Sequence, residues 1–280
     1  MNNLAKRTVV GLILGGIIII IIFIHPIALY FTSIVWIALA TVEFTRMLKI
    51  REIFLNRFLM IILNVLIPTI FYFNYLIHKS SSTTSYNILY LIPVLVFFVY
   101  ALIKYERYFL IVPLGIFTLF YLGFLPSHLL FLKIWTKMQN FSFWKAGFIT
   151  LFPVAFTWIN DTAAYLVGSA IGKHKLASQI SPKKTIEGFV SSIIVSIVFT
   201  LIYLTKLFSN INIWLAIVVG LILSIAAQLG DLVESGFKRA AALKDSSQII
   251  PGHGGFLDRI DSLLFTIPMF YYILIYIIKP

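Results

Sequence analysis

The chain has 280 residues, of which 60% are apolar and only 11% charged, and its formal net charge is +12. A soluble domain is usually about half apolar and about a quarter charged, so this composition indicates a polytopic membrane protein. Cysteine is absent, which excludes disulfide scaffolds, thiolate zinc sites, iron–sulfur clusters and cysteine nucleophiles.

Long apolar runs recur along the chain, and a helix needs roughly 20 apolar residues to cross the hydrocarbon core of a bilayer. Because lipid satisfies no backbone hydrogen bond, these runs predict transmembrane helices. The first helix is expected to be retained, because no small-residue cleavage site follows its basic start. We expect an all-α protein with about nine spans, although eight or ten would also fit, over residues 8–24, 26–42, 58–77, 88–103, 109–131, 146–160, 188–204, 213–230 and 262–278.

The basic residues favour one orientation of these spans. With the N-terminus in the cytoplasm, 16 of the 22 lysines and arginines fall on the inner side and six on the outer side. The positive-inside rule therefore predicts an N-in, C-out topology. Loops that face anionic lipid head groups also account for the positive charge, so nucleic acid is not expected as a partner.

The ten acidic residues are more informative, because a carboxylate near hydrocarbon is costly and persists only with a partner or a function. Seven of them lie in the segments 160–188 and 228–262, which this topology places on the cytoplasmic side. We therefore expect an N-terminal transmembrane scaffold, residues 1–150, and a C-terminal catalytic region, residues 151–280. The other three acids are interpreted as interfacial charges beside arginines: Glu43, Glu52 and Glu106.

Two groups of acids in the second segment fall on helix faces. If the eighth helix continues past the membrane surface, one face carries Asp231, Glu234, Ser235 and Lys238. Asp258 and Asp261 lie one turn apart at the start of the ninth helix, where capping of the helix dipole is the simpler explanation. Carboxylates from two helices with interleaved basic residues are nevertheless what a magnesium–phosphate site requires, since Mg²⁺ prefers oxygen ligands and lysine and arginine neutralise phosphate.

A glycine-rich turn precedes Asp258 and contains Gly252, His253, Gly254 and Gly255. Glycine lets backbone N–H groups approach an anion, but a tight turn between helices explains the pattern equally well. His253 is a candidate phosphate donor, although an isolated loop histidine is more often a simple hydrogen-bonding residue. No zinc site is predicted, because no other histidine or cysteine lies nearby.

The first acidic segment contains a glycine pair and a lysine pair. Glycines at 168 and 172 predict close helix packing, because a Walker A loop would need one more residue. Ser181-Pro182 fits an N-cap followed by the first helical residue. Lys183 and Lys184 are therefore expected to project from a helix start, where anions bind readily.

From Ser235 to Asp261 the chain follows the pattern S-x-x-K-R-x(4)-K-D, then P-x-H-G-G-x-x-D-R-x-D. This resembles the signature of the phosphatidate cytidylyltransferase (CDP-diacylglycerol synthase) family. Two positions upstream depart from the family pattern: Ser169 stands where Lys or Arg is common, and Ile186 where tryptophan is common. The fixed positions are filled by Ser235, Lys238, Arg239, Lys244, Asp245, Pro251, His253, Gly254, Gly255, Asp258, Arg259 and Asp261.

The resemblance implies transfer of a cytidylyl group from CTP to phosphatidic acid, which gives CDP-diacylglycerol and pyrophosphate. It implies Mg²⁺ at the site and also a second, monovalent cation such as K⁺. As metal ligands it implies Asp231, Asp258 and Asp261, supported by Asp161 and Glu234. As catalytic phosphate-holding residues it implies Lys238, Arg239, Lys244 and Arg259. For substrate binding it implies Lys183, Lys184, Ser235, His253, Gly254 and Gly255.

Two other functions remain to be weighed. A cation-coupled transporter also carries intramembrane acids, but it would place them near mid-membrane in both halves of the chain. A CDP-alcohol phosphotransferase is disfavoured because its D-G-x-x-A-R frame is absent. By the resemblance we expect a bacterial inner membrane protein whose active site faces the cytoplasm, and the sequence leaves open whether two copies form a homodimer.

Overall fold

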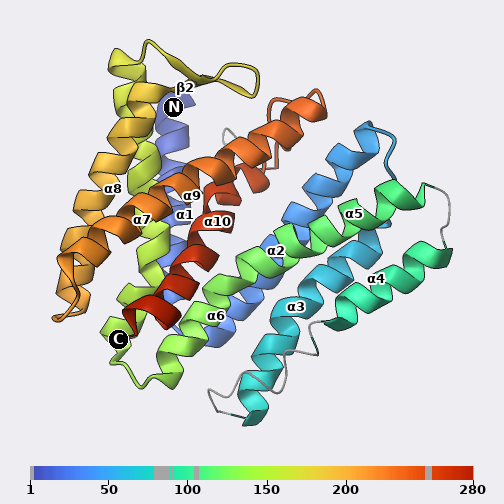
Figure 1. The fold of residues 1–280 in the computed structure, drawn as a ribbon. Helices are drawn as coiled ribbons and strands as arrows, with labels where there is room; N and C mark the ends of the chain where they lie inside the picture. The colour runs from blue at the N-terminus through green and yellow to red at the C-terminus, as the bar shows by residue number, and fades with distance from the viewer. Residues whose placement is uncertain (1–2, 79–88, 90, 104–106, 250–253, 280) are drawn as a thin grey trace. The chain divides into compact units, whose positions relative to one another are not determined.

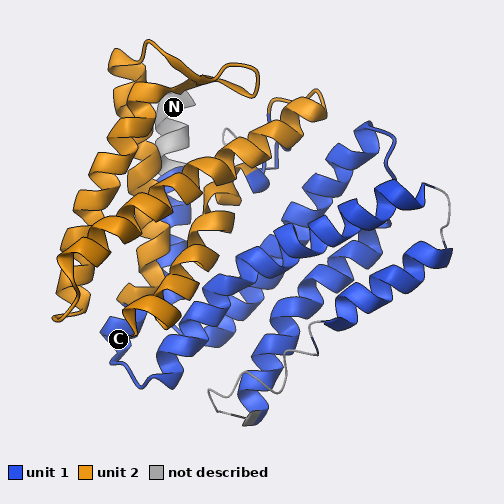
Figure 2. Ribbon diagram, in the orientation of Figure 1, with its two compact units in different colours: residues 1–147, 245–257 blue, residues 148–244, 258–280 orange. Residues whose placement is uncertain are grey.

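The structure is a computed structural model that describes residues 3–78, 89, 91–103, 107–249 and 254–279 (Figure 1). The chain forms two compact units, which Figure 2 shows in different colours. Unit 1 contains residues 1–147 and 245–257, and unit 2 contains residues 148–244 and 258–280. The signature segment is thus shared between the two units, because 245–257 groups with the N-terminal helices.

Unit 1 is built from helices whose apolar side chains form its core. Its central helices pack together, with α2 against α3 and α6, and α3 against the π-helical turn η3. A buried polar bond joins two of them, since the Asn64 side chain donates to Thr41 Oγ1 at 2.9 Å. The helices are α1 (Asn3–Phe23), α2 (Pro26–Ile50), α3 (Arg57–His78), α4 (Leu91–Ile103), α5 (Tyr108–Thr118), η3 (Leu119–Phe124) and α6 (Leu125–Met138).

Unit 2 places long helices beside a short β-hairpin. Helix α8 packs along α9, and both contact the second strand of the hairpin. Asn160, fully buried, accepts hydrogen bonds from Ser196 on α8 and Ser224 on α9. The elements are α7 (Phe143–Ile171), β1 (Lys175–Ala177), β2 (Ser181–Thr185), α8 (Ile186–Leu207), α9 (Ile213–Ala240), α10 (Leu257–Ile273) and the π-helical η4 (Leu274–Ile278).

The helices confirm the prediction of a polytopic, predominantly helical membrane protein. Each of the predicted segments overlaps a helix. Among the described residues, six helices are long and apolar enough to cross a membrane: Pro26–Ile50, Arg57–Ile77, Tyr108–Met138, Ile186–Leu207, Ile213–Ala240 and Leu257–Ile278. Two more, Gly11–Phe23 and Leu91–Ile103, are apolar but shorter, and α7 is not among the six. A count of nine crossings therefore stays a prediction, as does the orientation.

The hairpin contradicts one prediction, because no helix starts at Ser181-Pro182. Residues 181–185 form strand β2, paired antiparallel with β1 so that Lys175 lies opposite Thr185 and Ala177 opposite Ser181. A two-stranded sheet has only edge strands, where proline is tolerated. Helix α8 begins at Ile186 instead, capped by Thr185, whose Oγ1 accepts a hydrogen bond from the backbone N–H of Gly188 at 3.2 Å.

The predicted close packing at the glycine pair is confirmed. A Cβ atom added to Gly168 would lie 2.8 Å from Thr185 Oγ1 and 3.5 Å from Gly188 Cα. One added to Gly172 would meet the Thr185 side chain. These glycines therefore let α7 approach the start of α8 and hold the end of β2 in place.

Candidate active site

The acidic residues of α9 and α10 come together at a close contact between the backbones of the two helices. A Cβ atom added to Gly230 on α9 would lie 2.5 Å from the carbonyl oxygen of Asp261 and 3.0 Å from Ser262 Cα, both on α10. Only glycine fits such a contact between backbones without displacing one of them. Asp231 follows this glycine directly, so the close approach sets Asp231 beside the N-terminal turns of α10.

Asp231 is held by groups from its own helix and from β2. Its Oδ2 forms an ion pair of 2.9 Å with Lys184 Nζ, and its Oδ1 accepts a hydrogen bond of 3.1 Å from Ser235 Oγ. Lys184 also donates to the side-chain oxygen of Gln228 at 3.0 Å. The hairpin therefore delivers a lysine to the acidic face of α9. The sequence predicted Lys184 and Ser235 as site residues, but it gave no reason to select Gln228.

A second lysine joins α9 to α10. Lys238 Nζ lies 2.5 Å from Asp258 Oδ1 and also pairs with Glu234 one turn earlier on α9. The Glu234 side chain is fully buried, and the other two are about nine-tenths buried. Two carboxylates around one ammonium form a charged group whose members depend on each other, because removal of one leaves a buried charge without compensation. The predicted shared face of Asp231, Glu234, Ser235 and Lys238 is confirmed.

Two further aspartates lie within electrostatic range of this group. The Asp261 carboxylate interacts with those of Asp231 and Asp161, and Asp161 interacts in turn with Lys184. Asp261 also accepts a hydrogen bond of 2.7 Å from the backbone N–H of Ser262. The Asn160 side chain donates to Asp161 at 3.3 Å. Asn160 therefore connects the buried junction of α7, α8 and α9 to the acids, and a polar residue in an apolar helix was its only signal in the sequence.

The arrangement sets limits on how a metal ion could bind. Within the part of the chain that the structure describes, no group of three or more His, Asp or Glu side chains is placed to hold a metal ion. Mg²⁺ often takes only one or two protein carboxylates and completes its shell with water and substrate phosphate. The acids of α9 and α10 fit such a partial oxygen shell. Asp231, Asp258 and Asp261 as joint ligands stay a prediction.

The remaining predicted phosphate ligands of unit 2 lie on its surface. Arg239 Nε donates to the carbonyl oxygen of Ile180 at 3.1 Å, and Arg239 Nη1 to that of Leu243 at 2.9 Å. Arg239 thereby ties the end of α9 to the hairpin turn. Lys183 on β2, Lys244 after α9 and Arg259 on α10 are exposed.

The glycine turn of the signature belongs to unit 1. Gly254 has a φ of 82°, a backbone conformation that favours glycine. Gly255 is buried, and a Cβ atom there would meet Ser246 Oγ and would lie 2.9 Å from Glu43 Oε2. Both positions are thus restricted by backbone geometry or by packing. His253 lies outside the described residues.

The interpretation of Glu43 as an interfacial charge is wrong. Its side chain is 1% exposed and accepts hydrogen bonds from residues of the 245–257 segment. Local sequence suggested an ion pair with Arg46, but the nearest donors come from residues that are distant in the chain. Glu52 is exposed, as expected, and Glu106 lies outside the described residues.

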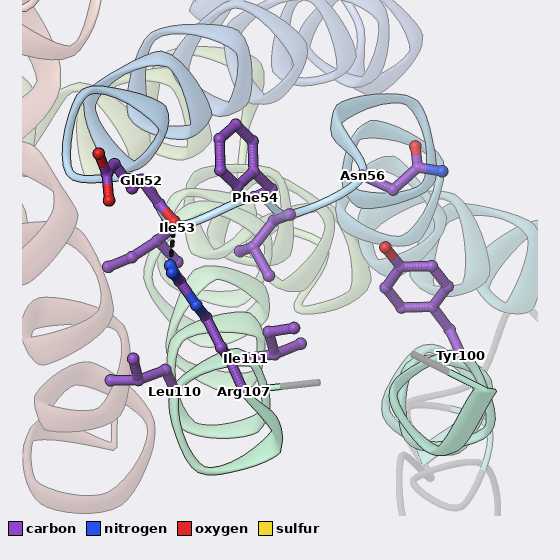
Figure 3. Close-up of a pocket in the computed structure, with 9 residues that line it drawn as sticks. Glu52, Ile53, Phe54, Asn56, Tyr100, Arg107, Leu110 and Ile111 are labelled. Atoms are coloured by element: carbon purple, nitrogen blue, oxygen red, sulfur yellow. Dashed lines mark hydrogen bonds between the residues drawn. The ribbon is translucent and has the colours of Figure 1, made fainter. Parts of the chain in front are cut away.

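A separate pocket of unit 1 contains none of the predicted site residues. It has a volume of about 550 Å³ and lies between the loop after α2 and helices α4 and α5 (Figure 3). Arg107 Nη1 donates to the carbonyl oxygen of Glu52 at 2.7 Å, as the dashed line shows. The pocket is lined by Glu52, Ile53, Phe54, Leu55, Asn56, Tyr100, Arg107, Leu110 and Ile111.

Curated relatives are similar to about half of this chain. A phosphatidate cytidylyltransferase of Staphylococcus haemolyticus is 51% identical over 125 residues, which are 45% of this chain and 48% of the relative. The Staphylococcus saprophyticus protein of the same name is 50% identical over 127 residues, 45% of this chain and 49% of the relative. The one from Staphylococcus aureus strain COL is 50% identical over 125 residues, with 45% and 48% covered. The chain thus spans about half the length of the curated relatives that it matches.

A family model extends the similarity over nearly the whole chain. The model described as the cytidylyltransferase family matches residues 5–277. This range covers nearly all of both units and contains every acidic and basic residue of the candidate site. The chain therefore belongs to the cytidylyltransferase family.

Proposed function

We propose that this protein transfers the cytidylyl group of CTP to phosphatidic acid, with CDP-diacylglycerol and pyrophosphate as products. The observation that carries this proposal is the set of lysine–carboxylate pairs where α9, α10 and β2 meet, in a chain of the cytidylyltransferase family. The names of the relatives support phosphatidate as the acceptor. The cation-coupled transporter has no comparable support.

The chemistry needs little acid–base catalysis. A phosphate oxygen of phosphatidate attacks the α-phosphorus of CTP. The bond between the α-phosphorus and the oxygen that bridges to the β-phosphate breaks, and pyrophosphate leaves with that bonding pair. The attacking oxygen is already ionised near neutral pH, so no strong general base is required. The protein must bring two polyanions together and stabilise the charge that develops on the leaving group.

The two lysines are suited to that task. Lys184 pairs with one carboxylate and Lys238 with two, so each ammonium is positioned before substrate arrives. An ammonium on a flexible stem can turn from a carboxylate to a phosphate oxygen, since both are anionic acceptors. In the proposed reaction these lysines orient the phosphates, while Arg239, Lys244 and Arg259 attract the nucleotide from the aqueous side.

When the lysines turn from the carboxylates to phosphate oxygens, the carboxylates become free to bind Mg²⁺ in the proposed reaction. Asp231, Asp258 and Asp261, supported by Asp161 and Glu234, would supply one or two carboxylates to the ion. When bound, Mg²⁺ would neutralise phosphate charge and align the polyphosphate. A second, monovalent cation such as K⁺ is proposed on the family resemblance alone.

The location follows from the two substrates. Phosphatidate stays in the bilayer with its head group at the interface, whereas CTP is soluble in the cytoplasm. We propose that the protein lies in a bacterial inner membrane and that the lysine–carboxylate pairs face the cytoplasmic interface.

The test is product formation by the detergent-purified protein. Phosphatidate and CTP are supplied with and without Mg²⁺, and both pyrophosphate and CDP-diacylglycerol are measured. The expected result is equal release of both products that requires lipid and Mg²⁺. Diacylglycerol in place of phosphatidate is the matched control, since it lacks the attacking phosphate. Absence of product with phosphatidate in mixed micelles and in vesicles would reject the proposal.

A further inference from the structure

A buried carboxylate in unit 1 accepts hydrogen bonds from the segment that directly precedes Asp258. Glu43 lies on α2, and its hydrogen-bond donors lie at least 203 residues further along the chain. The segment 245–257 groups with unit 1 although the residues on either side of it belong to unit 2. Glu43 therefore joins helix α2 to residues of the segment 245–257.

Four donors converge on the two oxygens of Glu43. Oε2 accepts from Ser246 Oγ at 3.0 Å and from the backbone N–H of Leu257 at 2.7 Å. Oε1 accepts from Ser247 Oγ at 2.5 Å and from the backbone N–H of Phe256 at 2.8 Å. A deprotonated carboxylate is an acceptor only, with room for about four hydrogen bonds. The donor set thus matches the full accepting capacity of this side chain.

The residues that contact Glu43 are closely packed. Ser246 and Ser247 are 2% and 8% exposed. The ring of Trp36 on α2 lies 5.8 Å from that of Phe256, which adds an apolar contact beside the polar ones. The Ser246 and Glu43 side chains occupy the space where a side chain of residue 255 would lie, so even a methyl group on Gly255 would displace them.

The anchored backbone ends one residue before Asp258. Phe256 and Leu257 donate the N–H groups at the start of α10, which lack partners inside the helix. An anion at this end also complements the helix dipole. Because Asp258 and Arg259 follow directly in the first turn, the position of this turn depends on the Glu43 carboxylate.

We infer that Glu43 is a positioning residue that holds Ser246, Ser247, Phe256 and Leu257 and thereby positions the following residues, Asp258 and Arg259, for the cytidylyl transfer. The inference rests on the proposed function. Glu43 itself is expected to contact neither substrate, and it acts through Ser246, Ser247 and the first turn of α10. It is therefore expected to affect the alignment of the reacting groups more than the binding of the substrates, since the other phosphate-binding groups of the proposed site, Lys184 and Lys238, lie outside the segment.

The test compares Glu43→Gln with Glu52→Gln in the full-length, detergent-purified protein. Glutamine keeps the size of the side chain but turns one acceptor into a donor that faces other donors. Hydrogen–deuterium exchange of peptides covering 245–257 reports the anchor directly, and steady-state kinetics report its effect on catalysis. Glu52 lies just after the same helix, is exposed, and its side chain takes no part in the cluster, so it controls for the charge change.

We expect Glu43→Gln to speed exchange of the Phe256 and Leu257 amides, and to lower kcat, by about tenfold or more, since hydrogen bonds to a charged group are lost. The KM for CTP is expected to change by less than about threefold, because Lys184, Lys238 and Arg239 lie outside the anchored segment and still bind phosphate in the proposed reaction. Glu52→Gln is expected to match the wild type in both measurements. Unchanged exchange in Glu43→Gln overturns the inference, and so does faster exchange with unchanged kcat or with an effect on KM alone.

Two further arms keep the test decisive. If Glu43→Gln does not fold, Ser247→Ala is tested instead, because it removes one of the donors to Glu43 and leaves the carboxylate in place. It should also speed amide exchange and lower kcat, but by less than Glu43→Gln. A wild-type protein that forms no CDP-diacylglycerol rejects the proposed function, while the exchange data still show whether Glu43 anchors the segment.

Discussion

Carboxylates are buried in both units, but their partners differ in kind. Glu43 in unit 1 is surrounded by two hydroxyls and two backbone N–H groups, all neutral and fixed in place. In unit 2 Asp231, Glu234 and Asp258 each pair with a lysine ammonium group, and Asp231 also accepts a hydrogen bond from the Ser235 hydroxyl. Fixed neutral donors hold a carboxylate permanently, whereas an ammonium can exchange its carboxylate for a phosphate. Under the proposed function, this difference distinguishes a structural carboxylate in unit 1 from carboxylates in unit 2 whose lysines can bind phosphate.

The largest effect is expected at Lys238, which holds two carboxylates at once. Lys238→Met should lower the free energy of unfolding by about 3–5 kcal/mol, because Glu234 is left buried without its cation. Adding Glu234→Gln should recover most of the lost free energy of unfolding without restoring activity. Thermal unfolding in detergent and CDP-diacylglycerol formation measure the two effects. If the double variant is no more stable than Lys238→Met, the dependence of Glu234 on this lysine is disproved.

Asp258→Asn tests the other partner of Lys238. We expect turnover to fall at least about a hundredfold, because the charge that sets Lys238 and serves the phosphate site is lost. The amount of folded protein in the membrane should stay near that of the wild type, which size-exclusion chromatography after extraction would show. Wild-type activity in this variant would remove Asp258 from the active site.

Gly230→Ala tests the close approach of α9 and α10. The added methyl group would meet the Asp261 carbonyl oxygen and Ser262 Cα, so we expect a loss of about 1–3 kcal/mol in unfolding free energy. Gly236→Ala on the same helix is the matched control, because nothing lies within 4 Å of its Cβ position. It should be neutral or stabilise by up to about 1 kcal/mol through helix propensity. Equal thermal unfolding of the two variants would contradict the contact.

Lys184→Met tests the lysine that the hairpin provides. Loss of its ammonium should lower kcat/KM for CTP about tenfold, the size expected for one charge-assisted hydrogen bond. Lys175→Met on the facing strand is exposed and should stay close to wild type. An equal decrease in both variants would mean that net positive charge, and not the pair with Asp231, supports activity.

The smallest effect is expected at Ser169, where the chain departs from the family pattern. The side chain is exposed and its hydroxyl donates to the carbonyl oxygen of Leu166 on its own helix at 3.1 Å. Ser169→Lys should therefore change activity by less than about twofold, as surface changes usually do. A large change in CDP-diacylglycerol formation would show that a cation at this position contacts substrate.

The sequence by itself determined the membrane helices and the local polar faces. Composition alone required apolar helices, because a bilayer tolerates no open backbone. The face that carries Asp231, Glu234, Ser235 and Lys238 followed from the helical repeat, which depends only on neighbours within two turns. The pairs within that face, Ser235 with Asp231 and Lys238 with Glu234, are of the same local kind.

Tertiary structure decided the contacts between residues far apart in the chain. Pairing between nearby segments also mattered, since residues 181–185 form a strand against 175–177 and not the helix start that their sequence favours. Tertiary structure placed Gly230 in a contact with α10, and it buried Glu43, predicted at the lipid interface, against Ser246, Ser247, Phe256 and Leu257. Periodicity carries no information on these choices, since the partners of a buried polar group are set by which elements pack against it.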